Sequence, residues 1–160
     1  MEWHKRFDSE AGTFRLTATD KASALAEVVR GLVDVAALDP ALADDALATL
    51  LAREEIASTG VGMNVAIPHV RLHGLQEAVC SLSIAPAGIP WAAVDGEPVQ
   101  LLFVVLRPGE ATDLHDPEDH LEMMRWIARL ARDPDFRAVA LQAESRQALM
   151  GLLKDMCTAQ

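Results

Sequence analysis

The feature that most limits the possible folds of this chain is an uninterrupted apolar run, LLFVVL, at residues 101–106. A strand with no polar face has to be covered on both sides, and a sheet with helices on both faces provides that cover. Residues 78–85, AVCSLSIA, predict a second strand, and the alternation over residues 14–18 predicts a short third one. The chain is therefore expected to build a sheet around the apolar run.

Helical patterns precede and follow these strands. Thr19 or Asp20 is a typical start for one helix, and Asp39 with Pro40 is a typical start for the next. A strongly amphipathic pattern, HLEMMRWIARLAR, follows at residues 120–132. Its expected core-facing residues are Leu121, Met124, Ile127, Ala128 and Ala131.

Two further helices are predicted, over residues 133–143 and 144–157, with Ser145 capping the last one. The order of short strands and helices indicates the α/β class. We expect a mixed β-sheet flanked by helices on both faces. Residues 1–160 are expected to form a single domain, with an ordered core over about 14–153.

Composition excludes several classes of function. The net charge of −10 argues against binding to nucleic acid or to an anionic membrane, but it leaves protein partners open. No apolar run is long enough to span a bilayer and no signal peptide is recognisable, so a cytoplasmic location without membrane insertion is expected. Cys80 and Cys157 fit no metal-ligand spacing and are expected to be reduced thiols.

The most informative stretch for function is REEIASTGVGMNVAIPHVR, at residues 53–71. Pro68 fixes its own φ and favours an extended conformation at Ile67, so that His69 follows on a stiff backbone. A histidine with an ordinary pKa is largely neutral at cellular pH, and its ring can act as a nucleophile. His69 is therefore the candidate acceptor of a phosphoryl group.

The residues before His69 have the chemistry that such a transfer needs. Arg53 lies at the expected end of a helix and offers positive charge for phosphoryl oxygens. Ser58 and Thr59 offer hydroxyl groups, and Gly60 and Gly62 let the backbone turn sharply or approach a ligand closely. We predict that Arg53 stabilises the phosphoryl group and that the other four residues bind it.

These residues resemble the active-site region of enzyme IIA domains of the mannitol/fructose class. Such domains belong to the phosphoenolpyruvate-dependent sugar phosphotransferase system, and the class includes stand-alone nitrogen-regulatory IIA proteins. The resemblance covers about residues 14–153 and implies the same α/β fold. Its matching positions are Arg53, Glu54, Ser58, Thr59, Gly60, Gly62, Ala66, Ile67, Pro68 and His69.

The resemblance also implies a second active-site histidine at a helix start, in a His-Leu pair. His120 and Leu121 match that pair, although the preceding loop, at 111–119, is longer than in the family and leaves His115 as an alternative. Acidic residues in this loop are expected to make His120 easier to protonate. His115 is expected to lie outside the site, in the extra loop.

The same loop, HDPEDH at residues 115–120, has residue types that ligate metals, but nothing in its spacing fixes a coordination geometry. We predict no metal site and no cofactor. No nucleophile-elbow motif supports a hydrolase.

Two functions remain open. The resemblance implies a phosphocarrier that accepts the group from a phosphorylated histidine carrier protein. It would pass the group to a IIB domain of a sugar permease or hold it as a regulatory mark, and the absence of an attached IIB domain favours the nitrogen-regulatory branch. The alternative is an interaction module with a IIA fold, in which phosphorylation is vestigial.

Overall fold

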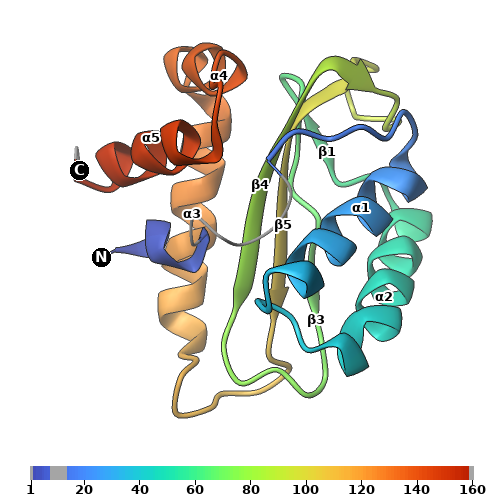
Figure 1. Ribbon diagram of the computed structural model, residues 1–160, viewed down its shortest axis with the longest axis vertical. Helices are drawn as coiled ribbons and strands as arrows, with labels where there is room; N and C mark the ends of the chain where they lie inside the picture. Colours follow the sequence, from blue (N-terminus) through green and yellow to red (C-terminus); the bar gives the residue numbers. More distant parts are fainter. Residues whose placement is uncertain (1, 8–13, 159–160) are drawn as a thin grey trace.

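The computed structural model describes residues 2–7 and 14–158, which form one mixed sheet between two layers of helices (Figure 1). One face of the sheet is covered by α1 (Lys21–Asp34) and α2 (Ala43–Ile56), with the short η2 (Pro40–Leu42) leading into α2. The elements on the other face are η1 (Trp3–Phe7), α3 (Pro117–Arg132), α4 (Pro134–Leu141) and α5 (Arg146–Thr158). The predicted fold class is confirmed.

The sheet is organised around β5 (Val99–Arg107), which pairs on both of its sides. β4 (Val79–Ile89) lies antiparallel along one side of it. β2 (Val65–Ala66) and β3 (His69–Arg71) lie parallel along the other side, one after the other. β1 (Gly60–Gly62) pairs antiparallel with β2 and completes the sheet. This arrangement brings the end of β3 beside the end of β5.

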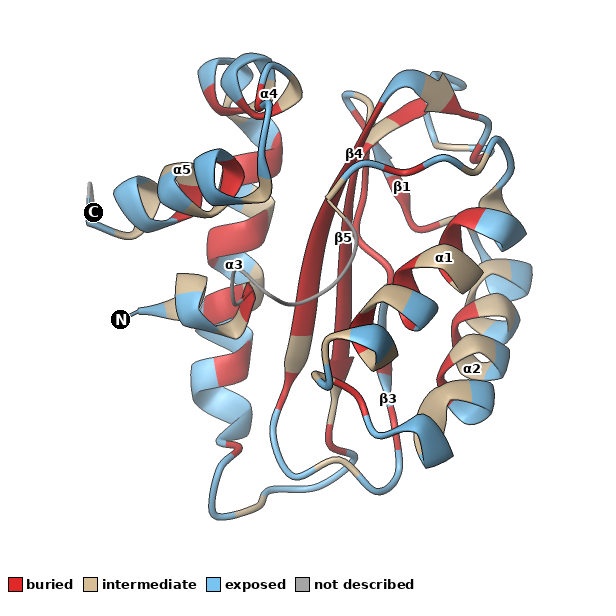
Figure 2. Cartoon of the chain, viewed as in Figure 1, coloured by how far each residue is buried: buried red, intermediate tan, exposed pale blue. Residues whose placement is uncertain are grey.

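The side chains of β5 alternate between two separate cores, as expected of a strand buried on both faces. Leu101, Phe103 and Val105 pack with the elements on the α3 side. Leu102, Val104 and Leu106 pack with those on the α1 and α2 side. Figure 2 shows β4 and β5 buried along most of their length. The central position predicted for the apolar run is therefore confirmed.

The helix starts predicted at Asp20, Asp39 and Ser145 are confirmed, but the helix expected to open at His120 begins three residues earlier, at Pro117. Asp20, Asp39 and Ser145 each accept a backbone N–H group in the first turn of the helix that follows, and thereby satisfy donors that have no partner within the helix. The strand expected at residues 14–18 is reduced to a single bridge between Arg15 and Ile84. No helix within residues 2–7 and 14–158 is long and apolar enough to cross a membrane.

The predicted core face of α3 was wrong at its start, because Leu121 is 51% exposed. The centre of this face is Trp126, which packs against Trp3 and Phe7 of η1. Because η1 lies more than 100 residues away in sequence, its packing was not evident from the helical pattern, and it also extends the core before residue 14. The buried residues of α3 are His120, Met123, Trp126, Ile127, Leu130 and Ala131.

Candidate active site

His69 is the first residue of β3, at the edge of the sheet, and its side chain is exposed. The amide of Val105 donates a hydrogen bond to the Pro68 carbonyl at 2.9 Å, which fixes the backbone just before the histidine. His69 Nδ1 lies 2.8 Å from the carbonyl oxygen of Ile67. Since a carbonyl oxygen can only accept, Nδ1 carries the proton and Nε2 keeps a free lone pair.

His69 and Arg53 line the same groove, which has a volume of about 430 Å³ and lies between α2 and the ends of the strands. Arg53 is in the last turn of α2, and its Nη1 donates a 2.7 Å hydrogen bond to the Ala57 carbonyl just beyond that helix. This bond satisfies a carbonyl at the helix end and holds the guanidinium group near the groove. The remaining residues of the groove are Thr49, Ala52, Ile56, Val70, Arg71 and Arg107.

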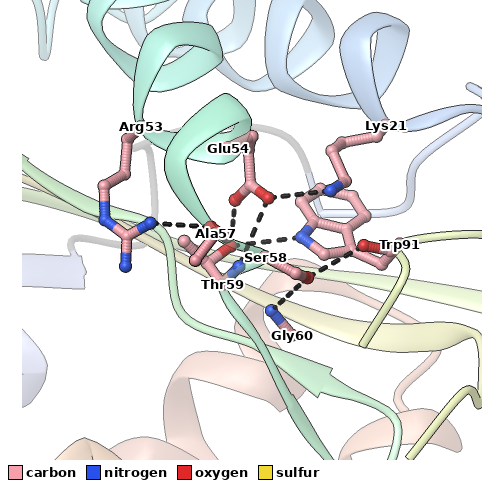
Figure 3. A network of polar contacts seen from close by, with 8 residues as sticks. All are labelled: Lys21, Arg53, Glu54, Ala57, Ser58, Thr59, Gly60 and Trp91. Atoms are coloured by element: carbon pink, nitrogen blue, oxygen red, sulfur yellow. Dashed lines mark hydrogen bonds and ion pairs between the residues drawn. The ribbon is translucent and has the colours of Figure 1, made fainter. Parts of the chain in front are cut away.

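Glu54, the neighbour of Arg53, points to the opposite side and centres a buried polar network (Figure 3). Its carboxylate forms an ion pair with Lys21 Nζ at 2.8 Å and accepts a 3.2 Å hydrogen bond from the Thr59 amide. It also accepts a hydrogen bond from the Thr59 hydroxyl, which in turn accepts one from Trp91 Nε1 at 3.1 Å. This network ties α1, α2, β1 and the segment after β4 together.

The Ser58–Gly62 turn, predicted to bind the phosphoryl group, is occupied by internal contacts. Ser58 Oγ donates to the Trp91 carbonyl at 2.9 Å and accepts from the Gly60 amide at 3.1 Å. A Cβ atom on Gly60 would lie 2.6 Å from Ala93 Cβ, and Gly62 has a φ of +89°. The Thr59 carbonyl accepts a hydrogen bond from the Ile67 amide, so this turn supports the backbone that leads to His69.

Replacing Glu54 with Ala is expected to lower the free energy of unfolding by about 3 kcal/mol, because it leaves Lys21 and Thr59 without their buried partner. The Glu54 side chain is only 5% exposed, so water cannot replace the carboxylate without rearrangement. The measurement is urea unfolding followed by circular dichroism. Glu55→Ala, on the exposed side of the same turn, is the matched control and should change stability by less than about 0.5 kcal/mol. A loss below about 1 kcal/mol for Glu54→Ala would contradict the importance of the network.

His120 is 9% exposed and lies in the first turn of α3, with its Nδ1 buried and without a partner among the described residues. Burial lowers the pKa of His120 to about 4, and the positive charges of Arg107 and of neighbouring histidines, including His69, add to this effect. The expectation that acidic neighbours ease its protonation is therefore wrong. His120 is therefore a neutral imidazole at cellular pH, and a positive charge on His69 would lower its pKa further.

His115 does not extend outward in the extra loop, because its side chain is only 6% exposed and its ring lies against His120, with centroids 5.3 Å apart. Reciprocal backbone hydrogen bonds between Thr112 and His115 hold the loop in this position. Burial, with Arg107 and Arg6 nearby, also lowers the pKa of His115. The expectation for His115 failed because the extra loop folds back over η1 and α3, around a cavity of about 310 Å³. Within the described residues, no group of three or more His, Cys, Asp or Glu side chains could hold a metal ion.

Two arginines in the groove, Arg71 and Arg107, were missed by the sequence analysis. Each lies at the end of a strand, and they become neighbours only because β3 pairs in parallel with β5. The signal in the sequence was weak: Arg107 follows the apolar run directly, and Arg71 follows His69 by two residues. Only the register between the strands places both next to the histidine.

The comparisons with known proteins agree with the motif. The family model described as phosphoenolpyruvate-dependent sugar phosphotransferase system, EIIA 2, matches residues 6–156. A nitrogen regulatory protein from Pseudomonas aeruginosa is 40% identical over 111 residues, which cover 69% of this chain and 69% of that protein. A fructose-specific EIIA component from Haloferax volcanii is 34% identical over 113 residues, which cover 71% of this chain and 70% of that protein.

A solved structure agrees over nearly the whole length. The crystal structure of the nitrogen regulatory protein IIA-Ntr from Neisseria meningitidis superposes with a TM-score of 0.77 at 25% identity, covering 94% of this chain and 97% of that one. The resemblance drawn from the motif is thereby confirmed. This chain belongs to the EIIA 2 family of the phosphoenolpyruvate-dependent sugar phosphotransferase system.

Proposed function

We propose that the protein is a phosphocarrier in which Nε2 of His69 accepts a phosphoryl group from a phosphorylated histidine carrier protein. The group then passes to a IIB domain of a sugar permease or remains as a regulatory mark. The observation that carries this proposal is the 2.8 Å contact between Nδ1 and the Ile67 carbonyl, because it leaves Nε2 as the free nucleophile in a groove that also holds Arg53.

In the transfer step, the Nε2 lone pair forms a bond to phosphorus while the nitrogen–phosphorus bond of the donor breaks. The leaving ring of the donor keeps the electron pair of the broken bond. The His69 ring gains positive charge as the new bond forms, and the Nδ1–H group shares that charge with the Ile67 carbonyl. Arg53 stabilises the negative charge on the transferring oxygens.

Direct phosphoryl binding by Ser58, Thr59, Gly60 and Gly62 stays a prediction. The internal hydrogen bonds of Ser58 and Thr59 support an indirect contribution instead, in which the turn fixes the position of Ile67 and therefore of the carbonyl that orients His69. A substitution that loosens this turn would reduce transfer by increasing the mobility of the histidine ring.

We further propose that His120 helps to hold the phosphoryl group as a neutral N–H donor. Its lowered pKa supports this protonation state, and the burial of Nδ1 leaves Nε2 as the nitrogen available to the group. The ring of His115, packed against it, acts as a positioning residue that keeps His120 in one orientation.

His120→Ala is expected to slow transfer by about 10²-fold, since a preorganised donor to the phosphoryl oxygens is lost. His120→Gln places an amide N–H near the position of Nε2 and should recover most of that loss. Both results come from single-turnover transfer measured between pH 6 and pH 8. Because a group with a pKa near 4 does not titrate in this range, His120→Gln and the parent should show the same pH profile. A parent profile that falls through pH 6.5, with a flat profile for His120→Gln, would instead indicate a cationic His120.

The two relatives that guide the choice of pathway have different names, one a nitrogen regulatory protein and one a fructose-specific EIIA component. The higher identity to the former favours a regulatory role, in which the phosphorylation state of His69 is read by a target protein. An interaction module with vestigial phosphorylation is the alternative.

Incubation of the protein with phosphoenolpyruvate, enzyme I and the histidine carrier protein distinguishes these functions. A phosphocarrier forms a stoichiometric phosphoryl adduct during the assay. This adduct is labile in acid and stable in base. A protein that binds its target but forms no adduct under these conditions would be the interaction module instead.

A further inference from the structure

Arg71 and Arg107 are direct partners in the parallel pairing of β3 with β5. They follow the pair formed by His69 and Val105 by two residues on each strand. Since side chains on a strand alternate between faces, the two arginines lie on the same face as His69. Val105 packs toward α3, so this is the face on which His120 lies.

This arrangement places two like charges side by side, and neither forms an ion pair with a carboxylate of the described residues. Directly opposed like charges on neighbouring strands are destabilising. Ion pairs form between Lys5 and Glu2, Arg6 and Glu77, Lys21 and Glu54, and Arg125 and Glu122, and neither Arg71 nor Arg107 takes part in one of them. Burial and the charge of Arg71 both lower the pKa of Arg107. An unbalanced pair is notable in a chain whose net charge is −10.

Arg107 lies near both histidines of the proposed reaction. Both arginines line the groove that contains His69 and Arg53. Arg107 also lies near enough to His120 for its charge to lower the pKa of that imidazole. A phosphoryl group bound to His69 Nε2 would therefore lie near Arg53 of α2 on one side and near the two arginines at the strand ends on the other.

We propose that Arg71 and Arg107 form a clamp for a dianionic phosphoryl group carried by His69. This inference rests on the proposed function and adds two phosphoryl-contacting residues to it. The guanidinium groups bind the oxygens that face the strand ends, with the planar geometry suited to phosphate. The phosphoryl group in turn supplies negative charge to both guanidinium groups, so its attachment offsets the repulsion between the two arginines.

The test uses phosphoramidate, a small-molecule phosphoryl donor, so that no partner protein is needed. The full-length protein is phosphorylated, the modified residue is identified by mass spectrometry, and the last ionisation of the phosphoryl group is followed by ³¹P NMR as a function of pH. Arg107→Met keeps an apolar stem and removes the charge. Arg30→Met, on the exposed surface of α1, makes the same change in net charge away from the groove.

The clamp predicts that the phosphoryl group of Arg107→Met ionises about one pH unit higher than that of the parent, a tenfold change in proton affinity. Arg30→Met should match the parent. The parent should also melt at a higher temperature after phosphorylation, and Arg107→Met should lose that gain. Arg71 is exposed, so Arg71→Met allows a second measurement of the shift in phosphoryl ionisation if Arg107→Met folds poorly.

An adduct on His69 that ionises identically in the parent, Arg107→Met and Arg71→Met would overturn the clamp and leave the phosphocarrier intact. Failure of His69 to react in the parent, with the adduct on another histidine, would overturn the assignment of the acceptor and the clamp with it.

Discussion

His69→Ala is expected to abolish phosphorylation of the protein by the phosphorylated histidine carrier protein, with no measurable loss of stability. The side chain is exposed and its one described hydrogen bond is to the carbonyl of Ile67, so its removal leaves the core unchanged. Transfer disappears because the other histidines lack a free ring nitrogen in a groove with Arg53. The measurement is the amount of acid-labile phosphate per mole of protein, together with thermal unfolding of both proteins.

His73→Ala is the matched control for this substitution. It removes an exposed histidine four residues further along the chain and outside the groove. We expect it to be labelled to the same extent as the parent. Full labelling of His69→Ala, or loss of labelling in His73→Ala, would contradict the assignment of the acceptor.

Arg53→Lys is expected to slow transfer by about 10²–10³-fold while the protein remains folded. Lysine keeps the positive charge but loses the planar fork, which in arginine can hold the Ala57 carbonyl with one nitrogen and phosphoryl oxygens with the others. Rapid-quench measurement of a single turnover gives the rate of the chemical step directly. Arg30→Lys, on the exposed face of α1, makes the same chemical change outside the groove and should leave the rate unchanged.

A transfer rate for Arg53→Lys within twofold of the parent would remove Arg53 from the phosphoryl site. Thermal unfolding of the same variant separates this result from a structural one. If the lost hydrogen bond to Ala57 only frays the end of α2, stability falls slightly and the rate of transfer does not change.

The parts of the fold that depend on local sequence were predictable. The apolar run at 101–106 has no polar face, so its burial on both sides followed directly, and the caps at Asp20, Asp39 and Ser145 are short-range interactions. The core face of α3 was not predictable in the same way. Its register depends on contacts between Trp126 and η1, which only the folded chain brings together.

The same distinction applies to the candidate site, where residues close in sequence were predictable and residues brought together by folding were not. Arg53 and His69 are 16 residues apart within one motif, and the structure places both in one groove. The protonation state of His120 was mispredicted because acidic residues near in sequence proved less important than burial and the more distant Arg107. Arg71 and Arg107 depend on the pairing of two strands, which residue spacing cannot specify.

The assignment of His69 as the acceptor is tested most directly by identifying the ring nitrogen that carries the phosphoryl group. The ¹⁵N-labelled protein is phosphorylated by the histidine carrier protein, and its histidine rings are assigned by long-range ¹H–¹⁵N NMR. We expect nitrogen–phosphorus coupling at Nε2 of His69 alone, with a proton retained on Nδ1 by the carbonyl of Ile67. Coupling at Nδ1 of His69, or at a ring nitrogen of His73, His115 or His120, would contradict the assignment of Nε2 of His69 as the acceptor.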